Sequence, residues 1–176
     1  MITDLKLSSL LEATEKLCPS VSIEAGGAND PLSDEVAFAG INRYFNAEDW
    51  SDFDQNKLTV IQHPLRLELE KGAQIGYASS QVPEWDITIP LDVEKYNYQM
   101  LAKDTPFAWV GPKGLDILTI TNNDGENVIE QFFEVKDNKL FSKQSLKLFM
   151  VTTNPIIAQA DCLFYIVQSK ECSQAI

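Results

Sequence analysis

Residues 115–153 constrain the fold most strongly, because apolar β-prone runs alternate there with short turn sequences. The first turn contains Asp124-Gly125, and an Asp-Gly pair suits a tight hairpin because glycine adopts positive φ angles without a steric penalty. Short polar turns between such runs predict an antiparallel meander. The runs are residues 115–121, 127–135 and 146–153, and the turns between them lie at residues 122–125 and 136–139.

Further strand-like runs precede and follow this stretch. Residues 65–70 alternate leucine with charged residues, which is typical of a strand with one solvated face. Pro83 and Pro90 flank residues 85–89 and predict an edge strand or a sheet boundary, whereas residues 161–168 are apolar on both faces and predict a central strand. We expect a short helix at residues 96–103. The remaining expected strands are residues 21–24, 58–62, 75–79 and 107–110.

Two helices are predicted before the β-rich part. Leu7, Leu10, Leu11, Thr14 and Leu17 recur at spacings of three and four, and Pro19 ends this stripe. A second helix is expected over residues 34–46, with Ser33 as its N-cap and acids in its first turn. Its apolar face is formed by Phe38, Ile41 and Phe45.

Together these elements predict an α+β fold, in which two N-terminal helices precede a mostly antiparallel sheet that forms a sandwich or a partial barrel. A chain of 176 residues suits one globular domain, here 1–176. We divide it into an acidic, helical part (1–56), a β-rich part (57–168) and a frayed tail (169–176).

The net charge of −12 is concentrated in the N-terminal part. Residues 1–56 contain 11 acids and 3 bases, whereas residues 57–176 contain 15 acids and 11 bases. Such a surface repels phosphate groups, so we expect no direct binding of nucleic acid. It would attract a basic protein partner, and salt would weaken that attraction.

Residues 46–56 combine acids with aromatic residues and contain no base. One interpretation is a solvated loop whose aromatic side chains pack back on the core. The other is a recognition patch, in which aromatic anchors bind a basic partner that the carboxylates attract. The candidate partner-binding residues are Glu48, Asp49, Trp50, Asp52, Phe53 and Asp54.

The sequence predicts neither a metal nor a cofactor. Asp52-x-Asp54-x-Asn56 begins like a calcium loop, but Lys57 replaces its glycine and His63 its bidentate glutamate. Gly26-Gly27 is not followed by the Gly-Lys-Ser/Thr sequence of a phosphate loop. One histidine and scattered cysteines do not form a zinc site.

No catalytic signature is present either. His63 has no nucleophile motif to accompany it, so we interpret it as a structural or surface residue. Glu84 and Asp86 flank Trp85 as acids do in some sugar sites, but strand alternation produces the same pattern. Tyr77, Trp85, Tyr96, Tyr98 and Trp109 would either line an apolar ligand pocket or fill an ordinary core.

We expect a soluble, cytoplasmic protein with reduced thiols. The first residues lack the basic start and apolar run of a secretory signal, and no apolar run is long enough to span a bilayer. Cys18, Cys162 and Cys172 are odd in number and show no paired spacing, although a single bridge to Cys172 stays open.

The sequence therefore favours a non-enzymatic protein-binding module, such as an inhibitor or immunity protein for a basic partner. A structural subunit of a virion or secretion assembly is the first alternative, and with it self-association into a homo-oligomer stays open. A small-ligand binder or a carboxylate-based hydrolase is the second alternative.

Overall fold

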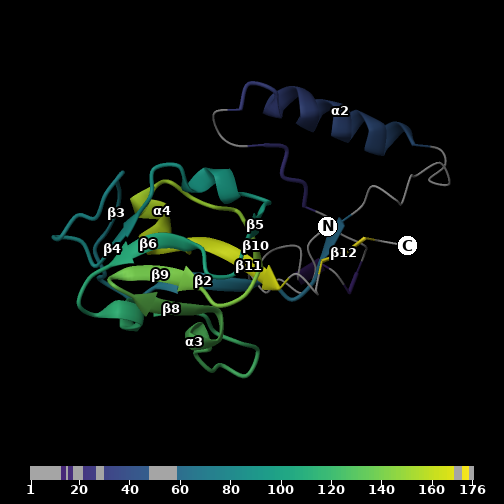
Figure 1. The fold of residues 1–176 in the computed structure, drawn as a ribbon. Helices are drawn as coiled ribbons and strands as arrows, with labels where there is room; N and C mark the ends of the chain where they lie inside the picture. Colours follow the sequence, from purple (N-terminus) through teal and green to yellow (C-terminus); the bar gives the residue numbers. More distant parts are fainter. Residues whose placement is uncertain are drawn as a thin grey trace. The chain divides into compact units, whose positions relative to one another are not determined.

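The computed structural model describes residues 13–14, 16–17, 22–26, 30–47, 59–168 and 172–174, shown in colour in Figure 1. The chain divides into an N-terminal unit that spans Leu5–Leu58 and a β-rich unit that spans Thr59–Ala175. Each unit is considered by itself below. The expectation that the whole chain forms one domain stays a prediction.

The N-terminal unit contains helix α2, Ser33–Asn46, as the sequence predicted. Asp34 and Glu35 occupy its first turn, where they complement the helix dipole. The predicted N-cap is wrong by one residue, because Leu32 holds that position and the Ser33 hydroxyl donates to the Asp30 carbonyl, 2.9 Å away. Residues 22–25 form no strand. The helix predicted around residues 7–17 lies mostly outside the described residues, although Ala13 and Thr14 are helical.

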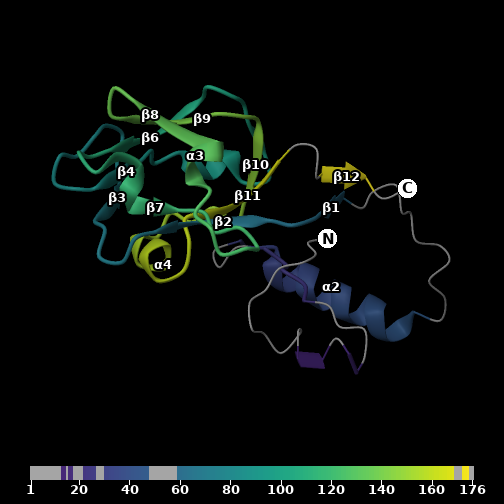
Figure 2. The ribbon, with the colours of Figure 1, turned by 90° about the horizontal axis from the view of Figure 1, so that it is seen from below.

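The β-rich unit is built on two five-stranded sheets (Figures 1 and 2). The first sheet has the order β5-β10-β11-β2-β7, and all its neighbouring strands are antiparallel. Its strands are β2 (Leu65–Leu69), β5 (Met100–Leu101), β7 (Leu118–Thr119), β10 (Leu146–Phe149) and β11 (Phe164–Gln168).

The second sheet has the order β3-β4-β6-β9-β8, and only its β3–β4 pair is parallel. Its strands are β3 (Ile75–Tyr77), β4 (Ile87–Ile89), β6 (Pro106–Val110), β8 (Phe133–Lys136) and β9 (Lys139–Ser142). A separate antiparallel pair joins β1 (Thr59–Ile61) to β12 (Cys172–Gln174).

One hydrophobic core lies between the two sheets. Phe107 of β6 meets Phe164 of β11 edge to face, with ring centroids 5.6 Å apart, and it also contacts Phe133 of β8 at 5.3 Å. All three side chains are buried. The α+β prediction and the mostly antiparallel arrangement are therefore confirmed, whereas the partial barrel is not supported because the sheets are not closed.

Two short α-helices and two 3-10 helices connect the strands. α4 lies beside β2 and β3, and α3 lies next to β8 (Figures 1 and 2). The α-helices are α3 (Ile129–Phe132) and α4 (Pro155–Ala160), and the 3-10 helices are η2 (Val93–Tyr96) and η3 (Gly114–Ile117).

The predicted meander is only partly correct. β8 and β9 form a hairpin across Asp137 and Asn138, whose positive φ angles of 48° and 59° suit a tight turn. However, β7 pairs with β2 and β10 pairs with β11, so the stretch contributes strands to both sheets. Between Thr121 and Asn127 only a single β-bridge forms.

Three other local predictions can be compared with the structure. β11 is central, as expected, because it lies between β10 and β2. β4 is not an edge strand, since β3 covers its other side despite the flanking prolines. The short helix expected at residues 96–103 is wrong: η2 ends at Tyr96, Tyr98 has a φ of 59°, and β5 follows.

Candidate functional site

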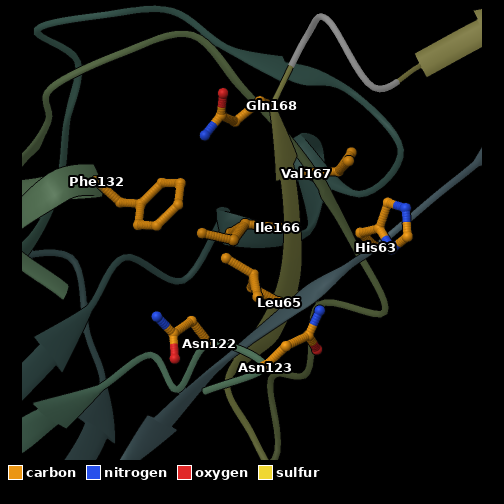
Figure 3. A pocket seen from close by; sticks show the side chains of 8 residues that line it. All are labelled: His63, Leu65, Asn122, Asn123, Phe132, Ile166, Val167 and Gln168. Atoms are coloured by element: carbon orange, nitrogen blue, oxygen red, sulfur yellow. The ribbon is translucent and has the colours of Figure 1, made fainter. Parts of the chain in front are cut away.

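A hollow of about 130 Å³ opens beside β2 and β11 in the β-rich unit (Figure 3). Its residues come from the start of β2, the turn after β7, the end of α3 and the end of β11. They are His63, Leu65, Asn122, Asn123, Phe132, Ile166, Val167 and Gln168. None of these side chains is a carboxylate, an ammonium or a guanidinium, so the hollow is not lined by a permanent charge.

The floor of the hollow is apolar. Ile166 and Phe132 belong to the hydrophobic core, and Leu65 packs against it. Figure 3 shows these three side chains on the same side of β11, whereas His63 and Val167 lie on the other side of the strand. Successive residues of a strand point to opposite faces, which explains why Ile166 and Val167 separate. Ile166 and Phe132 are almost fully buried, at 0% and 3% exposed, so of these three side chains only the half-buried Leu65 contributes much accessible surface to the hollow.

Asn122 on the rim is held in place by its own turn. Its Oδ1 accepts hydrogen bonds from the backbone N–H groups of Asp124 and Glu126, both at 2.9 Å. Its Nδ2 donates to the Glu126 carboxylate at 3.1 Å. These bonds use most of the hydrogen-bonding capacity of the Asn122 side chain and hold it in one orientation. Few of its donor and acceptor positions are left for a ligand.

Gln168, like Asn123, is a rim residue with unused hydrogen-bonding capacity in the described parts of the chain. Its register partner across the sheet is Leu146, whose own partner is Leu101, and both leucines are fully buried. Gln168 thus continues a core-facing row, with a carboxamide where the pattern would otherwise place an apolar side chain. It is half-buried, and its carboxamide has no hydrogen-bond partner within the described parts of the chain.

His63 lies in the connection between β1 and β2, where its φ of 49° is in the left-handed region. That conformation is uncommon for a residue with a Cβ, and Pro64 follows directly. His63 is exposed and is directed away from the apolar floor (Figure 3). This position agrees with the structural or surface role expected from the sequence.

A cluster of charged and polar groups occupies the other face of the same sheet. Arg66 of β2 forms ion pairs with Asp161 and with Glu68, the latter at 3.3 Å, and its guanidinium lies 5.8 Å from the ring centre of Tyr165. Burial raises the pKa of the neighbouring Cys162 thiol to about 11. A thiol that stays protonated at neutral pH is a poor nucleophile, so the raised pKa of Cys162 does not favour nucleophilic catalysis by this residue.

Of the two acids that flank Trp85, Asp86 has a structural role, whereas Glu84 is exposed. Asp86 accepts a hydrogen bond from the Gln74 backbone N–H at 2.9 Å and pairs with Lys113 at 3.0 Å. These contacts hold the pKa of Asp86 below its usual value. A general acid needs a raised pKa, so Asp86 does not suit that role.

The aromatic residues proposed as a ligand lining do not line the hollow. The Tyr77 hydroxyl donates to the Thr152 carbonyl at 2.8 Å, and burial raises its pKa to about 12. Trp85 packs over Gly76, where a Cβ would lie 2.2 Å from the indole ring. Both residues therefore have packing roles.

The six candidate partner-binding residues lie outside the described residues: Glu48, Asp49, Trp50, Asp52, Phe53 and Asp54. Within the described ranges, no group of three or more His, Cys, Asp or Glu side chains is placed to bind a metal ion. Helices in the same ranges are too short or too polar to cross a membrane.

Sequence reasoning missed Gln168, although it alternates with the core residues Phe164 and Ile166 and so could have been assigned to the inner face.

Helix α2 of the N-terminal unit presents apolar side chains that none of the described residues buries. It has no buried residue, although most of its large side chains are apolar. Phe38 is 72% exposed, Ile41 54% and Phe45 78%.

Comparisons of the chain with protein-family models, curated proteins and solved structures found no match.

Proposed function

We propose that this chain is a non-enzymatic protein-binding module, which inserts the apolar face of α2 into a groove of a basic partner protein. The exposure of α2 is the observation that carries the proposal. An isolated helix of 14 residues is only marginally stable in water, and most helical stability in proteins comes from packing an amphipathic face. A helix with this composition gains stability when a partner covers it.

The spacing of the exposed residues favours a helix-in-groove mode of binding. Phe38, Ile41 and Phe45 stand at positions i, i+3 and i+7, which places them on one side of the helix. The same spacing is used by amphipathic helices that bind in hydrophobic grooves. Large aromatic side chains in such a row supply most of the binding free energy as anchors.

Charge indicates the chemistry of the partner. Residues 30–56 contain seven acids and one base, Arg43. Four of these acids belong to the candidate segment 46–56, directly after α2. A basic rim around the partner's groove would therefore accelerate association, and salt would reduce this effect. An acidic inhibitor or immunity protein in the cytoplasm fits this description.

The first experiment is capture of binding proteins from a lysate of the source organism at low and high salt, followed by mass spectrometry. We expect one basic protein to be retained, and less of it at high salt. Phe38→Ala/Phe45→Ala should abolish retention. The matched control is Val36→Ala, which truncates an exposed apolar side chain about 160° around the helix from Phe38 and should leave retention unchanged.

The charge contribution is tested separately with Asp49→Lys, Asp52→Lys and Asp54→Lys in one variant. This variant should weaken retention at low salt and have little effect at high salt. Retention of the same protein by all variants would refute the proposal. If the wild-type chain instead forms oligomers in sedimentation experiments, and Phe38→Ala/Phe45→Ala makes it monomeric, the structural-subunit alternative replaces the proposal.

A further inference from the structure

We infer that strand β8 pairs antiparallel with β8 of a second copy of this chain, in a register centred on Val135, so that the β-rich unit forms a two-fold symmetric dimer. This inference concerns the β-rich unit and does not depend on the proposed role of α2. β8 lies at one end of the second sheet, and Figure 1 shows it beside β9, with no strand of the described chain on its other side.

β8 is the edge strand best suited to pairing with another strand. In the described part of the chain, the other edges of the two five-stranded sheets are β3, β5 and β7, with three, two and two residues, whereas β8 has four. Among these edges only β8 contains charged side chains, Glu134 and Lys136. An open edge presents backbone N–H and C=O groups that a further strand can pair with.

The backbone of β8 has free hydrogen-bonding groups at Val135. Lys136 and Lys139 close the two-residue turn of the β8–β9 hairpin, so they form a hydrogen-bonded pair, and the two kinds of pair alternate along the strands from there. Val135 and Leu140 are consequently a pair without mutual hydrogen bonds, and the N–H and C=O of Val135 point away from β9. In the described part of the chain no backbone hydrogen bond uses either group, and Val135 is only half-buried.

The charges on β8 are self-complementary in this register. Glu134 and Lys136 flank Val135 and point to the same face of the sheet, where Lys136 Nζ lies 2.6 Å from Glu134 Oε1. In an antiparallel pair centred on Val135, Glu134 of each copy lies opposite Lys136 of the other. Opposite charges at facing positions stabilise a strand pair, and like charges destabilise it. A parallel pair in register would place Glu134 opposite Glu134, so the charges favour the antiparallel arrangement.

This arrangement closes after two copies. Pairing about a two-fold axis uses the same surface on both chains, so it leaves no edge of β8 for a third copy. The Val135 N–H of each copy would donate to the Val135 carbonyl of the other, and the two second sheets would join into one continuous sheet. A contact made by strands of four residues buries little surface, so we expect a weak dimer that forms at high protein concentration.

The test is sedimentation equilibrium of the full chain at protein concentrations from about 10 μM to about 1 mM, at low and at high salt. We expect a reversible equilibrium between monomer and dimer. High salt should raise its dissociation constant, because the facing charges are accessible to solvent. Phe38→Ala/Phe45→Ala should dimerise like the wild type, since α2 takes no part in the contact.

Charge reversals test the register. Glu134→Lys and Lys136→Glu each place like charges opposite one another at two positions and should raise the dissociation constant at least about fivefold. Glu134→Lys/Lys136→Glu restores opposite charges at both positions and should dimerise like the wild type. Lys95→Glu is the matched control for Lys136→Glu, because it reverses the lysine of another exposed ion pair, formed with Asp92 at 2.6 Å, and should leave dimerisation unchanged.

A backbone variant tests the strand pairing itself. Val135→Pro removes the N–H at the centre of the contact, and proline is tolerated in an edge strand where the N–H faces solvent. It should abolish dimerisation while circular dichroism shows a folded chain, whereas Val135→Thr keeps the N–H and should dimerise. If Val135→Pro does not fold, the charge reversals decide.

Four results would overturn the inference. They are a wild-type chain that stays monomeric at about 1 mM, single charge reversals that leave the dissociation constant unchanged, a double reversal that does not restore the dimer, and a folded Val135→Pro variant that dimerises like the wild type.

Discussion

The contact between Phe107 and Phe164 tests whether the two sheets pack as described. The two rings belong to different sheets, meet edge to face with centroids 5.6 Å apart, and are both buried. Aromatic pairs of this kind contribute about 0.5–1.5 kcal/mol beyond the area that they bury. A double-mutant cycle with Phe107→Leu and Phe164→Leu should therefore show a coupling free energy in this range, on top of single effects of roughly 0.5–3 kcal/mol.

The free energies of unfolding would be obtained from urea denaturation, followed by the fluorescence of Trp109 and the other tryptophans and by far-ultraviolet circular dichroism. Trp109 lies in β6, close to Phe107 in the chain. The control cycle combines Phe107→Leu with Phe149→Leu. Phe149 stacks on Tyr165, on the face of the first sheet opposite to Phe164, so this pair should be additive within about 0.5 kcal/mol.

Equal coupling in both cycles would refute the reasoning, because it would mean that the substitutions disturb the whole unit instead of one contact. Coupling close to zero between Phe107 and Phe164 would equally contradict it, since the two inner faces would then not meet through these rings. A value within the expected range, together with an additive control, identifies this pair as one link between the sheets.

Three further predictions concern single sites. Gly76→Ala should destabilise the β-rich unit and shift the emission of Trp85, because the new Cβ would lie 2.2 Å from the indole ring; unchanged emission would contradict this. Asn154→Ala should lower the free energy of unfolding in urea by about 1 kcal/mol, because Asn154 Oδ1 accepts a hydrogen bond from the Ile156 N–H at the start of α4. Asn123→Ala is the control and should leave the free energy of unfolding unchanged. The pKa of the Cys162 thiol is raised to about 11 in the folded protein, so the folded state keeps the thiol proton up to about that pH. Between about pH 9 and 11 the thiol ionises in the unfolded chain only, so the free energy of unfolding should fall as the pH rises. Cys162→Ala should remove the part of this fall that the thiol causes.

Local patterns in the sequence were enough to locate most strands. Alternation identified β2, and apolar residues on both faces identified β11 as central. Helix α2 followed from the spacing of Phe38, Ile41 and Phe45. These predictions succeeded because the period of apolar residues reports directly which side of an element faces a core.

The division into two sheets was not predictable in the same way. β2 pairs with β7, and Glu68 lies opposite Thr119, about 50 positions further along the chain. Such pairing depends on long-range packing, which short-range patterns do not encode. The failure at residues 96–103 has a local cause instead: Tyr98 adopts a φ of 59°, a conformation that helix propensity does not anticipate for tyrosine.

The hollow illustrates how both kinds of information combine at a site. Alternation along β11 places Phe164, Ile166 and Gln168 on one face, so the sequence indicates a carboxamide in a row of core residues. Only the structure places the end of α3, with Phe132, across from that row and leaves a space between them. An apolar residue at position 168 would continue this row of core residues. Gln168→Leu should therefore raise the free energy of unfolding of the unit, measured by urea denaturation, because an apolar side chain loses no hydrogen bond to water when it packs at this position.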